Sequence, residues 1–370
     1  MRIGIDARFL TYPQHGGFKS YTRMVVSALT RVDRENEYIL YTDRPSDDIN
    51  DLPANFSVKP VSGANAVLRE QLTLPLRMLR DKNDIVHFLC NTAPVLFGLR
   101  MVVTVHDAIA LRKNNKFSRN VKQRLLRRYW HMVIPRSVSK ARLVLTDSEK
   151  AQGDLIETLA LTRDKLRVVY LAVDPEFAGE YPGTPPAEIQ PGMRFMLAFA
   201  SADGRKNHLS AIKAYRMARI YPNINLAVIC SHPGVHESVE PGSGVVMLGP
   251  VLFRELIWLY RNAVALVFPS FDEGFGLPPL EAMTCGTPVV ASNTGSLPEV
   301  LGDHVIFVDP ADVGSIAEGI RLMVRDDALR NRLIIEGRKH ASGFSLERMG
   351  RELMALYSEA CRCPHPNPLP

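Results

Sequence analysis

Short apolar runs rich in Val, Ile and Leu alternate with longer amphipathic stretches along almost the whole chain. The runs are apolar on both faces, as expected for strands of a parallel sheet that helices cover on both sides. The predicted strands are Arg2–Asp6, Tyr38–Thr42, Ser57–Val61, Ile85–Leu89, Met101–His106, Leu143–Thr146, Arg167–Leu171, Phe195–Ala200, Asn225–Cys230, Val245–Leu248, Ala265–Pro269, Pro288–Ser292 and Val305–Val308. The predicted helices are Tyr21–Arg31, Val121–Trp130, Leu209–Ala218, Phe253–Ala263 and Val313–Val324. This rhythm predicts a doubly wound α/β fold, and it occurs twice.

The length of 370 residues fits two such folds, because domains commonly hold about 100–200 residues. Residues 177–192 carry four prolines and three glycines, a composition that breaks helix and strand alike. We therefore predict an N-terminal domain over residues 1–176, a linker over 177–192 and a C-terminal domain over 193–345. The proline-rich residues 362–370 are expected to form a disordered tail.

The chain lacks the sequence features of a secreted, membrane-spanning or zinc-binding protein. Charged residues interrupt the first ten positions, where a signal peptide needs an apolar stretch, and no apolar run approaches the roughly 20 residues that span a bilayer. The five cysteines show neither CxxC spacing nor a disulfide framework. We expect a cytoplasmic protein, at most peripheral on the inner face of the plasma membrane, with reduced cysteines.

The net charge of +6 is concentrated in one segment, Arg112–Arg142, which holds eleven basic residues and no acidic residue. Its predicted helix, Val121–Trp130, intermixes these cations with Leu, Tyr and Trp, as interfacial membrane helices do. The alternative is a domain helix packed by its Leu side with a solvated basic face. No recognition motif for nucleic acid accompanies the charge, so nucleic acid is not an expected partner.

The most informative segment begins at Phe268, in FPSFDEGFGLPPLEAMTCGTPVV. A predicted strand is followed by a loop that contains Gly274 and Gly276, and Pro278 and Pro279 then open a helix. A glycine loop at a helix N-terminus presents free backbone N–H groups and the positive end of the helix dipole to an anion. The segment therefore predicts a phosphate site.

Two carboxylates, Glu273 and Glu281, frame this loop eight positions apart. A carboxylate only accepts hydrogen bonds and can take two hydroxyl donors, such as the diol of a ribose or a hexose. Glu281 can instead complement the helix dipole, and Glu273 can be a solvated loop residue; the spacing alone leaves these alternatives open.

The string EGFGLPPLEAMTCGTPVVAS resembles the Glu-x7-Glu signature of the family 4 glycosyltransferases. Further segments fall in that family's order, and together they cover nearly the whole chain: IGIDARFL with a Gly-Gly pair, TVHDAIAL, TDSEKAQGDL, YLAVDPEF, DGRKNHLSAIKAY and GSLPEVLGD. The resemblance implies the GT-B architecture, in which two Rossmann-like domains face each other across a cleft. It also implies that a final helix, over residues 346–361, packs back on the N-terminal domain.

The resemblance assigns the glycine loop to the donor substrate, a nucleotide-diphosphate sugar. Glu273 would bind hydroxyls of the donor sugar, and Glu281 the ribose hydroxyls. The backbone N–H groups that would meet the sugar and the diphosphate are those of Gly274, Phe275, Gly276 and Leu277.

Arg205 and Lys206 match the family's basic pair that neutralises the departing diphosphate. Preorganised cations stabilise the negative charge that develops on phosphate oxygens in the transition state. Many members carry one more arginine five positions before the lysine, where this chain has Ser201. Diphosphate neutralisation here is therefore expected to use fewer cations.

In the N-terminal domain the resemblance points to a glycine pair and to the end of a strand. Gly16 and Gly17 precede a predicted helix and permit close approach of a phosphate, or form a tight turn. His106 ends a strand at the carboxyl edge, where ligands bind in such sheets, and matches the family's active-site histidine, a contact to the donor sugar. Asp107 would orient His106 or bind the acceptor.

The family's reaction retains the anomeric configuration and needs no divalent metal, and this chain has no Asp-x-Asp triplet that would hold a metal-bound nucleotide sugar. We expect no cofactor and no metal site. The predicted activity is transfer of a mannose- or glucose-type hexose to a glycan or lipid-linked glycan acceptor, in lipopolysaccharide or exopolysaccharide biosynthesis. The alternatives are a non-catalytic nucleotide-sugar-binding scaffold and another GT-B enzyme such as a nucleotide-sugar epimerase.

Overall fold

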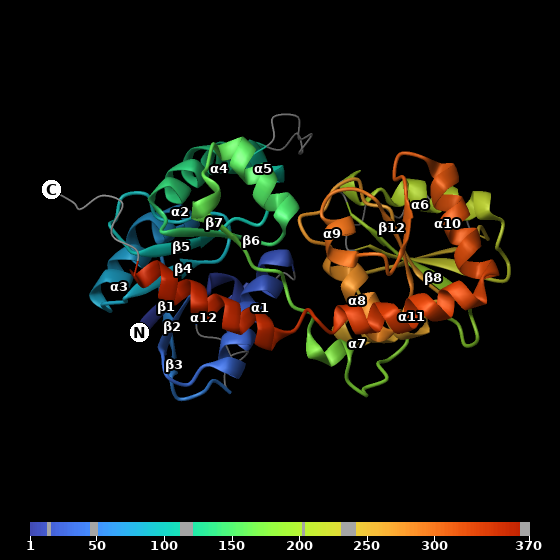
Figure 1. Cartoon of the computed structure of the whole chain (residues 1–370), viewed down its shortest axis with the longest axis horizontal. Helices are drawn as coiled ribbons and strands as arrows, with labels where there is room; N and C mark the ends of the chain where they lie inside the picture. Colours follow the sequence, from blue (N-terminus) through green and yellow to red (C-terminus); the bar gives the residue numbers. More distant parts are fainter. Residues whose placement is uncertain (13–15, 45–50, 112–120, 202–203, 231–241, 363–370) are drawn as a thin grey trace. The chain divides into compact units, whose positions relative to one another are not determined.

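The computed structural model describes residues 1–12, 16–44, 51–111, 121–201, 204–230 and 242–362. The chain divides into two compact units; in Figure 1 the first is coloured blue to green and also holds the red helix near the end of the chain, and the second runs from green to orange-red. The first unit comprises Met1–Ala172 and the chain from Leu346 onward, and the second comprises Val173–Ser345. Each unit is built on one parallel sheet, as the two rounds of alternating strands and helices predict.

The first unit holds seven parallel strands in the spatial order β3-β2-β1-β4-β5-β6-β7. They are β1 (Arg2–Asp6), β2 (Glu37–Thr42), β3 (Phe56–Pro60), β4 (Ile85–Phe88), β5 (Met101–Thr104), β6 (Leu143–Thr146) and β7 (Leu166–Val168). The longer helices of this unit are α1 (Gly17–Val32), α4 (Val121–Lys140), α5 (Glu149–Leu159) and α12 (Leu346–Arg362). A continuous helical segment is formed by α2 (Ala66–Leu68), a π-helical turn (Arg69–Thr73) and α3 (Leu74–Arg80). Short 3-10 turns cover Arg8–Thr11, Ile109–Leu111 and Arg163–Lys165.

The second unit holds six parallel strands in the order β10-β9-β8-β11-β12-β13. They are β8 (Phe195–Ala200), β9 (Asn225–Cys230), β10 (Val245–Leu248), β11 (Leu266–Phe268), β12 (Val289–Ser292) and β13 (Ile306–Val308). Its helices are α6 (His208–Ala218), α7 (Phe253–Asn262), α8 (Leu277–Cys285), α9 (Leu297–Leu301), α10 (Val313–Arg325) and α11 (Asp327–Ala341). Short 3-10 turns cover Pro175–Phe177 and Gly204–Lys206.

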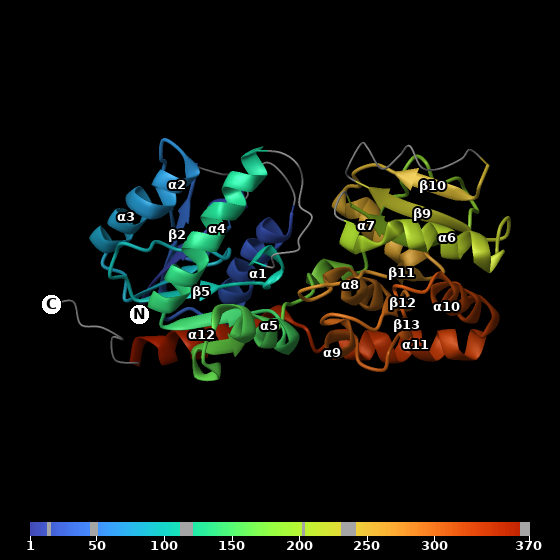
Figure 2. The same cartoon turned by 90° about the horizontal axis from the view of Figure 1, so that it is seen from above.

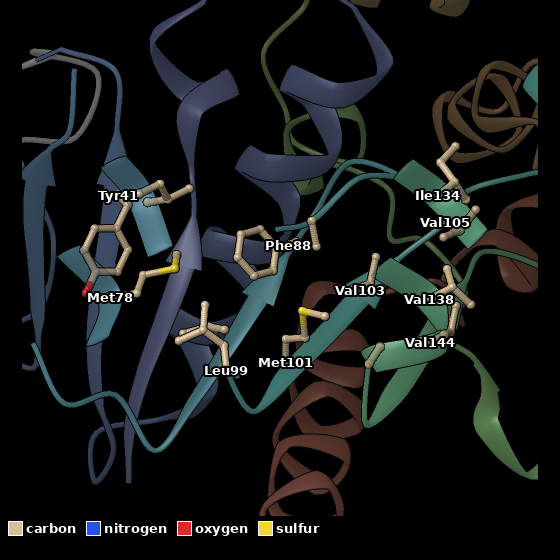
Figure 3. Packing of buried hydrophobic residues seen from close by; sticks show 14 of the residues in the cluster. Tyr41, Met78, Phe88, Leu99, Met101, Val103, Val105, Ile134, Val138 and Val144 are labelled. Atoms are coloured by element: carbon tan, nitrogen blue, oxygen red, sulfur yellow. The ribbon is translucent and has the colours of Figure 1, made fainter. Parts of the chain in front are cut away.

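Helices cover both faces of each sheet (Figure 2). In the first unit α3, α4 and α5 pack on one face through side chains such as Met78, Ile134, Val138 and Leu155, which meet Phe88 and the other strand residues of Figure 3. On the other face α1 and α12 cover the sheet. In the second unit α6 and α10 cover one face, and α7 and α8 contact the strands from the other.

Helix α12 packs closely against α1. Gly350 lies so near to α1 that a Cβ atom built there would be 2.6 Å from the carbonyl oxygen of Ala28. Arg31 and Glu347 form an ion pair of 2.9 Å between the two helices. Farther along α12 the hydroxyl of Tyr357 makes a buried hydrogen bond of 2.7 Å to Nδ1 of His87, in β4. The last described helix is therefore part of the first unit.

The proline-rich segment 177–192 lies inside the second unit and not between the two units, so the predicted linker is misplaced. Phe177 is buried, and its ring packs edge-to-face on Phe253 and Tyr260. The carbonyl oxygens of Phe177, Gly179 and Tyr181 all accept hydrogen bonds from Arg261. The prolines prevent regular structure in this segment, but they do not prevent it from packing. The chain passes between the units at residues 172–173 and 345–346. The tail expected over 362–370 lies outside the described residues except for Arg362, the last residue of α12.

Candidate active site

The predicted donor-site residues lie at the point where the strand order of the second sheet reverses. Strand β8 is paired with both β9 and β11, and the connections that leave β8 and β11 run in opposite directions from this point. The carboxyl ends of two such strands form the crevice where doubly wound sheets bind ligands. The turn that contains Lys206 follows β8, and the loop that contains Glu273 follows β11. The topology therefore brings two segments 67 residues apart to one place.

Lys206 and Glu273 form an ion pair, with Nζ 2.7 Å from Oε1. The ammonium group also lies 4.9 Å from the centre of the Phe268 ring, close enough for a cation–π contact. Both side chains are partly buried, at 26% and 12% exposure, so each charge is held in place by the other. A phosphate or a sugar hydroxyl that enters this site finds a cation and an acceptor already oriented.

The backbone around this pair is fixed by buried hydrogen bonds. The side chain of Asn207 donates to the carbonyl oxygens of Pro269 and Pro310, at 3.0 and 2.8 Å. The N–H of Phe271 donates to the carbonyl oxygen of Arg205 at 2.8 Å, which ties the Lys206 turn to the loop after β11. The Arg205 backbone thus belongs to the site, next to Lys206.

The loop before α8 has the geometry of an anion site. Gly276 caps the helix with φ +99°, a left-handed conformation that favours glycine, and a Cβ there would lie 2.4 Å from the side chain of Leu297. Pro278 and Pro279 occupy the first turn of α8, and no acidic residue lies in that turn. Since proline has no N–H, the backbone donors of this turn are those of Leu277 and Leu280, at the positive end of the helix dipole.

Glu273 is held by the segment before α9. Its carbonyl oxygen accepts hydrogen bonds from the hydroxyl of Ser296 at 2.9 Å and from the N–H of the same residue at 3.3 Å. A Cβ at Gly295 would lie 2.9 Å from the backbone nitrogen of Glu273, so this close approach requires glycine, which here has φ +63°. The GSLPEVLGD segment, whose role the sequence left open, therefore positions the loop after β11.

Glu281 lies on α8 and accepts a hydrogen bond of 2.8 Å from the hydroxyl of Tyr260, on α7. Desolvation raises the pKa of Glu281 to about 7, and this outweighs the hydrogen bond from Tyr260 and the positive charge of Lys206, which both lower it. A solvated residue that merely complements a helix dipole would not show such a shift. The carboxyl group of Glu281 is thus a shielded acceptor with one of its two oxygens engaged by Tyr260.

His106 follows β5 in the first unit, and both of its ring nitrogens have partners in the protein. Nδ1 lies 2.8 Å from Oδ2 of Asp147, and Nε2 lies 3.0 Å from the carbonyl oxygen of Leu89. The ring also contacts α1, edge-to-face on Tyr21 at 4.5 Å and tilted against Phe18 at 5.5 Å. His106 is therefore a well-anchored side chain at the carboxyl edge of the sheet.

Gly16 and Gly17 stand at the start of α1, directly before Phe18 and about one turn before Tyr21, the two residues that contact His106. No heavy atom of the described residues lies within 4 Å of a Cβ built at either glycine, so these residues leave the backbone there open to a ligand. Gly16 is extended, with φ −178°, and no acidic residue lies in the first turn of α1. The glycine pair and His106 are thus neighbours in the first unit, whereas Lys206, Glu273 and Glu281 belong to the second.

Asp107 accepts a hydrogen bond of 2.8 Å from the N–H of Ile109, so it fixes the turn after His106. The residue whose carboxylate orients His106 is Asp147, which follows β6 and lies 41 positions away. The sequence predicted Asp107 as the neighbour of the histidine and did not single out Asp147. The TDSEK segment could have indicated Asp147, because it follows β6, which is adjacent to β5 in the sheet.

The sequence also gave no sign of a charged network behind this edge. The buried carboxylate of Asp6 pairs with Arg8 and Arg69, and Arg8 pairs with Glu70 at 2.8 Å. Although burial acts to raise the pKa of Asp6, the two guanidinium groups hold it below the usual value. Glu70 accepts a further hydrogen bond from Tyr129, in α4. The network fixes the end of β1 and the π-helical turn.

Among the described residues, no helix is long and apolar enough to cross a bilayer. Within the same part of the chain, no three His, Cys, Asp or Glu side chains are grouped as ligands for a metal ion.

Solved structures that are likewise built of two doubly wound units define the class: the fold is that of the GT-B glycosyltransferases. Sucrose-phosphate synthase from Thermosynechococcus elongatus matches with a TM-score of 0.74 at 18% identity, over 97% of this chain and 98% of the other. The glycosyltransferase family 4 model matches residues 15–177, and the glycosyl transferases group 1 model matches residues 186–340. The two models together match most of the chain, which belongs to the family 4 (group 1) glycosyltransferases.

Two curated relatives illustrate the relationship. O-antigen chain mannosyltransferase B of Escherichia coli is 32% identical over 247 residues, which are 62% of this chain and 64% of the relative. D-inositol 3-phosphate glycosyltransferase of Corynebacterium jeikeium (strain K411) is 30% identical over 286 residues, which are 71% of this chain and 68% of the relative. The chain thus matches just under two thirds of the length of the first relative and just over two thirds of the second.

Proposed function

We propose that the protein is a retaining, metal-independent glycosyltransferase that moves a hexose from a nucleotide-diphosphate sugar to a growing glycan. The observation that carries the proposal is the Lys206–Glu273 ion pair, which lies just ahead of the N-terminus of α8 at the switch point of the second sheet. Mannose is the first candidate for the transferred sugar, because the Escherichia coli relative is named an O-antigen chain mannosyltransferase. The proposed pathway is lipopolysaccharide or exopolysaccharide biosynthesis.

The donor diphosphate would bind at the N-terminus of α8, against the loop from Gly274 to Leu277. Lys206 would neutralise the negative charge that develops on the diphosphate as the sugar–oxygen bond breaks. Glu281 would bind the ribose hydroxyls, and Glu273 would bind hydroxyls of the sugar. The diphosphate would then leave as an anion without a metal ion, and His106 with Gly16–Gly17 would supply the contacts of the first unit.

A panel of nucleotide sugars tests this proposal. One nucleotide hexose is expected to raise the melting temperature of the protein by about 5 to 10 °C at 100 times its Kd. The same sugar should be transferred to a glycan acceptor, with retained anomeric configuration by NMR and with an unchanged rate in EDTA. Binding without transfer to any lipid-linked or free glycan acceptor would favour the scaffold alternative. Inversion, or a loss of activity in EDTA, would contradict the proposed mechanism.

We also propose that α4 attaches the enzyme to an anionic membrane surface, where a lipid-linked acceptor would lie. The helix packs on the domain through Trp130, Ile134 and Val138, whereas Leu125 and Leu126 are exposed at 59% and 46%. The two leucines therefore lie away from the packed side of α4, which supports the proposal. Exposed apolar residues beside cations suit the boundary between lipid headgroups and acyl chains. Residues 112–120 of the basic segment lie outside the described residues.

Reversing Arg124, Arg127 and Arg128 to Glu should release the protein from anionic liposomes. Each basic residue near such a surface contributes about 1 kcal/mol, so the partition coefficient should fall by about 100-fold or more. Co-sedimentation with phosphatidylglycerol vesicles measures it. The matched control replaces two exposed cations of the second unit, Lys213 and Arg216, with Glu. Equal loss in the control, or no binding of the wild type, would exclude α4 as the attachment site.

A further inference from the structure

The hydrogen bonds of His106 determine where its protons lie. The carbonyl oxygen of Leu89 can only accept a hydrogen bond, so Nε2 of His106 must carry a hydrogen. On the other side of the ring Nδ1 lies 2.8 Å from the carboxylate of Asp147. When Nδ1 donates to this oxygen, it carries a hydrogen as well, and the ring is an imidazolium ion with both N–H groups bonded to the protein.

The surroundings favour this charged form. Burial acts to lower the pKa of His106, but the charge and the hydrogen bond of Asp147 raise it well above the ordinary value, and Cys90 adds to this. Burial holds three other titratable groups near the ring in their neutral forms. Burial raises the pKa values of the Cys90 thiol and of Tyr21 on α1, and it lowers the pKa of His87 in β4 to about 3.

The charge lies next to the N-terminus of α1. Phe18 and Tyr21, which contact the ring, belong to the first turns of that helix. The positive end of the helix dipole and the imidazolium ion therefore both contribute positive potential at the edge that holds Gly16 and Gly17. With both nitrogens engaged, the ring has no free lone pair to accept a proton and no free N–H to donate.

We propose that Asp147 is a positioning residue of the transfer site: it holds His106 as a permanent cation, and His106 acts in transfer as a fixed positive charge, not as a proton donor or acceptor. This inference rests on the proposed function for its catalytic part only. The cation acts on the ligand bound at the carboxyl edge of the first sheet, so the rate depends on the charged state of His106. The matched variant Asp147→Asn keeps the shape of the side chain and removes its charge.

NMR of the unliganded protein, labelled with ¹⁵N-histidine, tests the protonation state without any assay of transfer. The His106 signals, assigned by their loss in His106→Gln, should show two protonated nitrogens from pH 6 to pH 8.5. In Asp147→Asn the same ring should become neutral within this range, because burial then acts without the opposing carboxylate. A neutral His106 in the wild type at pH 7 would overturn the proposal, whatever reaction the protein catalyses.

The dependence of kcat/KM on pH tests the catalytic part. In Asp147→Asn the pKa of His106 should be lowered. Above that pKa the variant should lose activity relative to the wild type by about tenfold per pH unit, because the charged fraction of the His106 ring falls at that rate. The ratio should recover toward 1 at low pH, and Asp147→Glu, which restores the charge, should recover activity at pH 8. Asp154→Asn, which removes a more exposed carboxylate on α5, should match the wild type throughout. A ratio that does not change with pH would show that Asp147 is only structural and would overturn the proposed role.

Discussion

Replacing Lys206 with alanine should lower kcat/KM for sugar transfer by about 10²–10³-fold, the usual cost of removing one preorganised group that stabilises transition-state charge. The ammonium group is fixed by Glu273 at 2.7 Å and by the ring of Phe268, so no reorganisation is needed when the diphosphate departs. Most of the loss should therefore appear in kcat. Steady-state kinetics with the donor identified by the nucleotide-sugar panel provides the measurement.

Two variants accompany this experiment. Lys213→Ala removes an exposed cation from α6, the helix that follows Lys206, and should leave kcat/KM unchanged. Lys206→Arg keeps the charge but changes its shape, and should recover part of the rate. Turnover of Lys206→Ala close to that of the wild type would remove Lys206 from the catalytic site.

Replacing Glu281 with glutamine should weaken nucleotide binding and, at the same time, stabilise the folded protein above pH 7. A hydrogen bond to a charged acceptor is stronger than one to a neutral amide by about 1 kcal/mol, so affinity for the nucleoside diphosphate at pH 8 should fall by about 5- to 10-fold. Isothermal titration calorimetry measures it. Unchanged affinity would contradict the assignment of Glu281 to the ribose.

The effect on stability follows from the raised pKa. Desolvation raises the pKa of Glu281 from the ordinary 4.5 to about 7 in the folded state. The Glu281 carboxyl group therefore contributes at most about 3 kcal/mol to the free energy of unfolding. This contribution is fully present below pH 4.5 and is lost as the pH rises through 7. Because glutamine does not titrate, the variant should gain stability relative to the wild type over this window, as measured by urea unfolding at pH 4.5 and pH 8. Glu188→Gln, at an exposed glutamate, should show no such gain.

The sequence predicted the strands well, because both faces of each parallel strand are buried and the apolar runs are therefore unbroken. Every predicted strand is present, with ends that differ by a few residues at most. Helix α4 was predicted to end at Trp130 but continues to Lys140 through Pro135. Proline removes one backbone N–H and does not end a helix that is packed on a sheet, as this one is through Ile134 and Val138.

Periodicity and spacing alone grouped only site residues that are close in sequence, and the family resemblance added Lys206 and His106. Glu273, the glycine loop and Glu281 fall within nine residues and share one strand–loop–helix unit. Tyr260 and Asp147, which set the chemical state of Glu281 and His106, lie 21 and 41 positions from their partners. Contacts of this kind depend on which strands and helices become neighbours, and a periodic pattern does not contain that information. The linker was misplaced for the same reason: residues 177–192 pack against α7 and α8, which are distant in sequence.

The return of α12 to the first unit bears on the order in which the protein is made. His87 and Tyr357 are 270 residues apart, and a ribosome that adds about 5–20 residues per second needs about 13 to 54 s to separate their synthesis. During that time the face of the first sheet that α12 covers is without its helix, whereas the second unit, Val173–Ser345, can complete its own sheet first. Although it begins the chain, the first unit is therefore the last to be finished, and while α12 is missing it is the part of the nascent protein that a chaperone would have to shield.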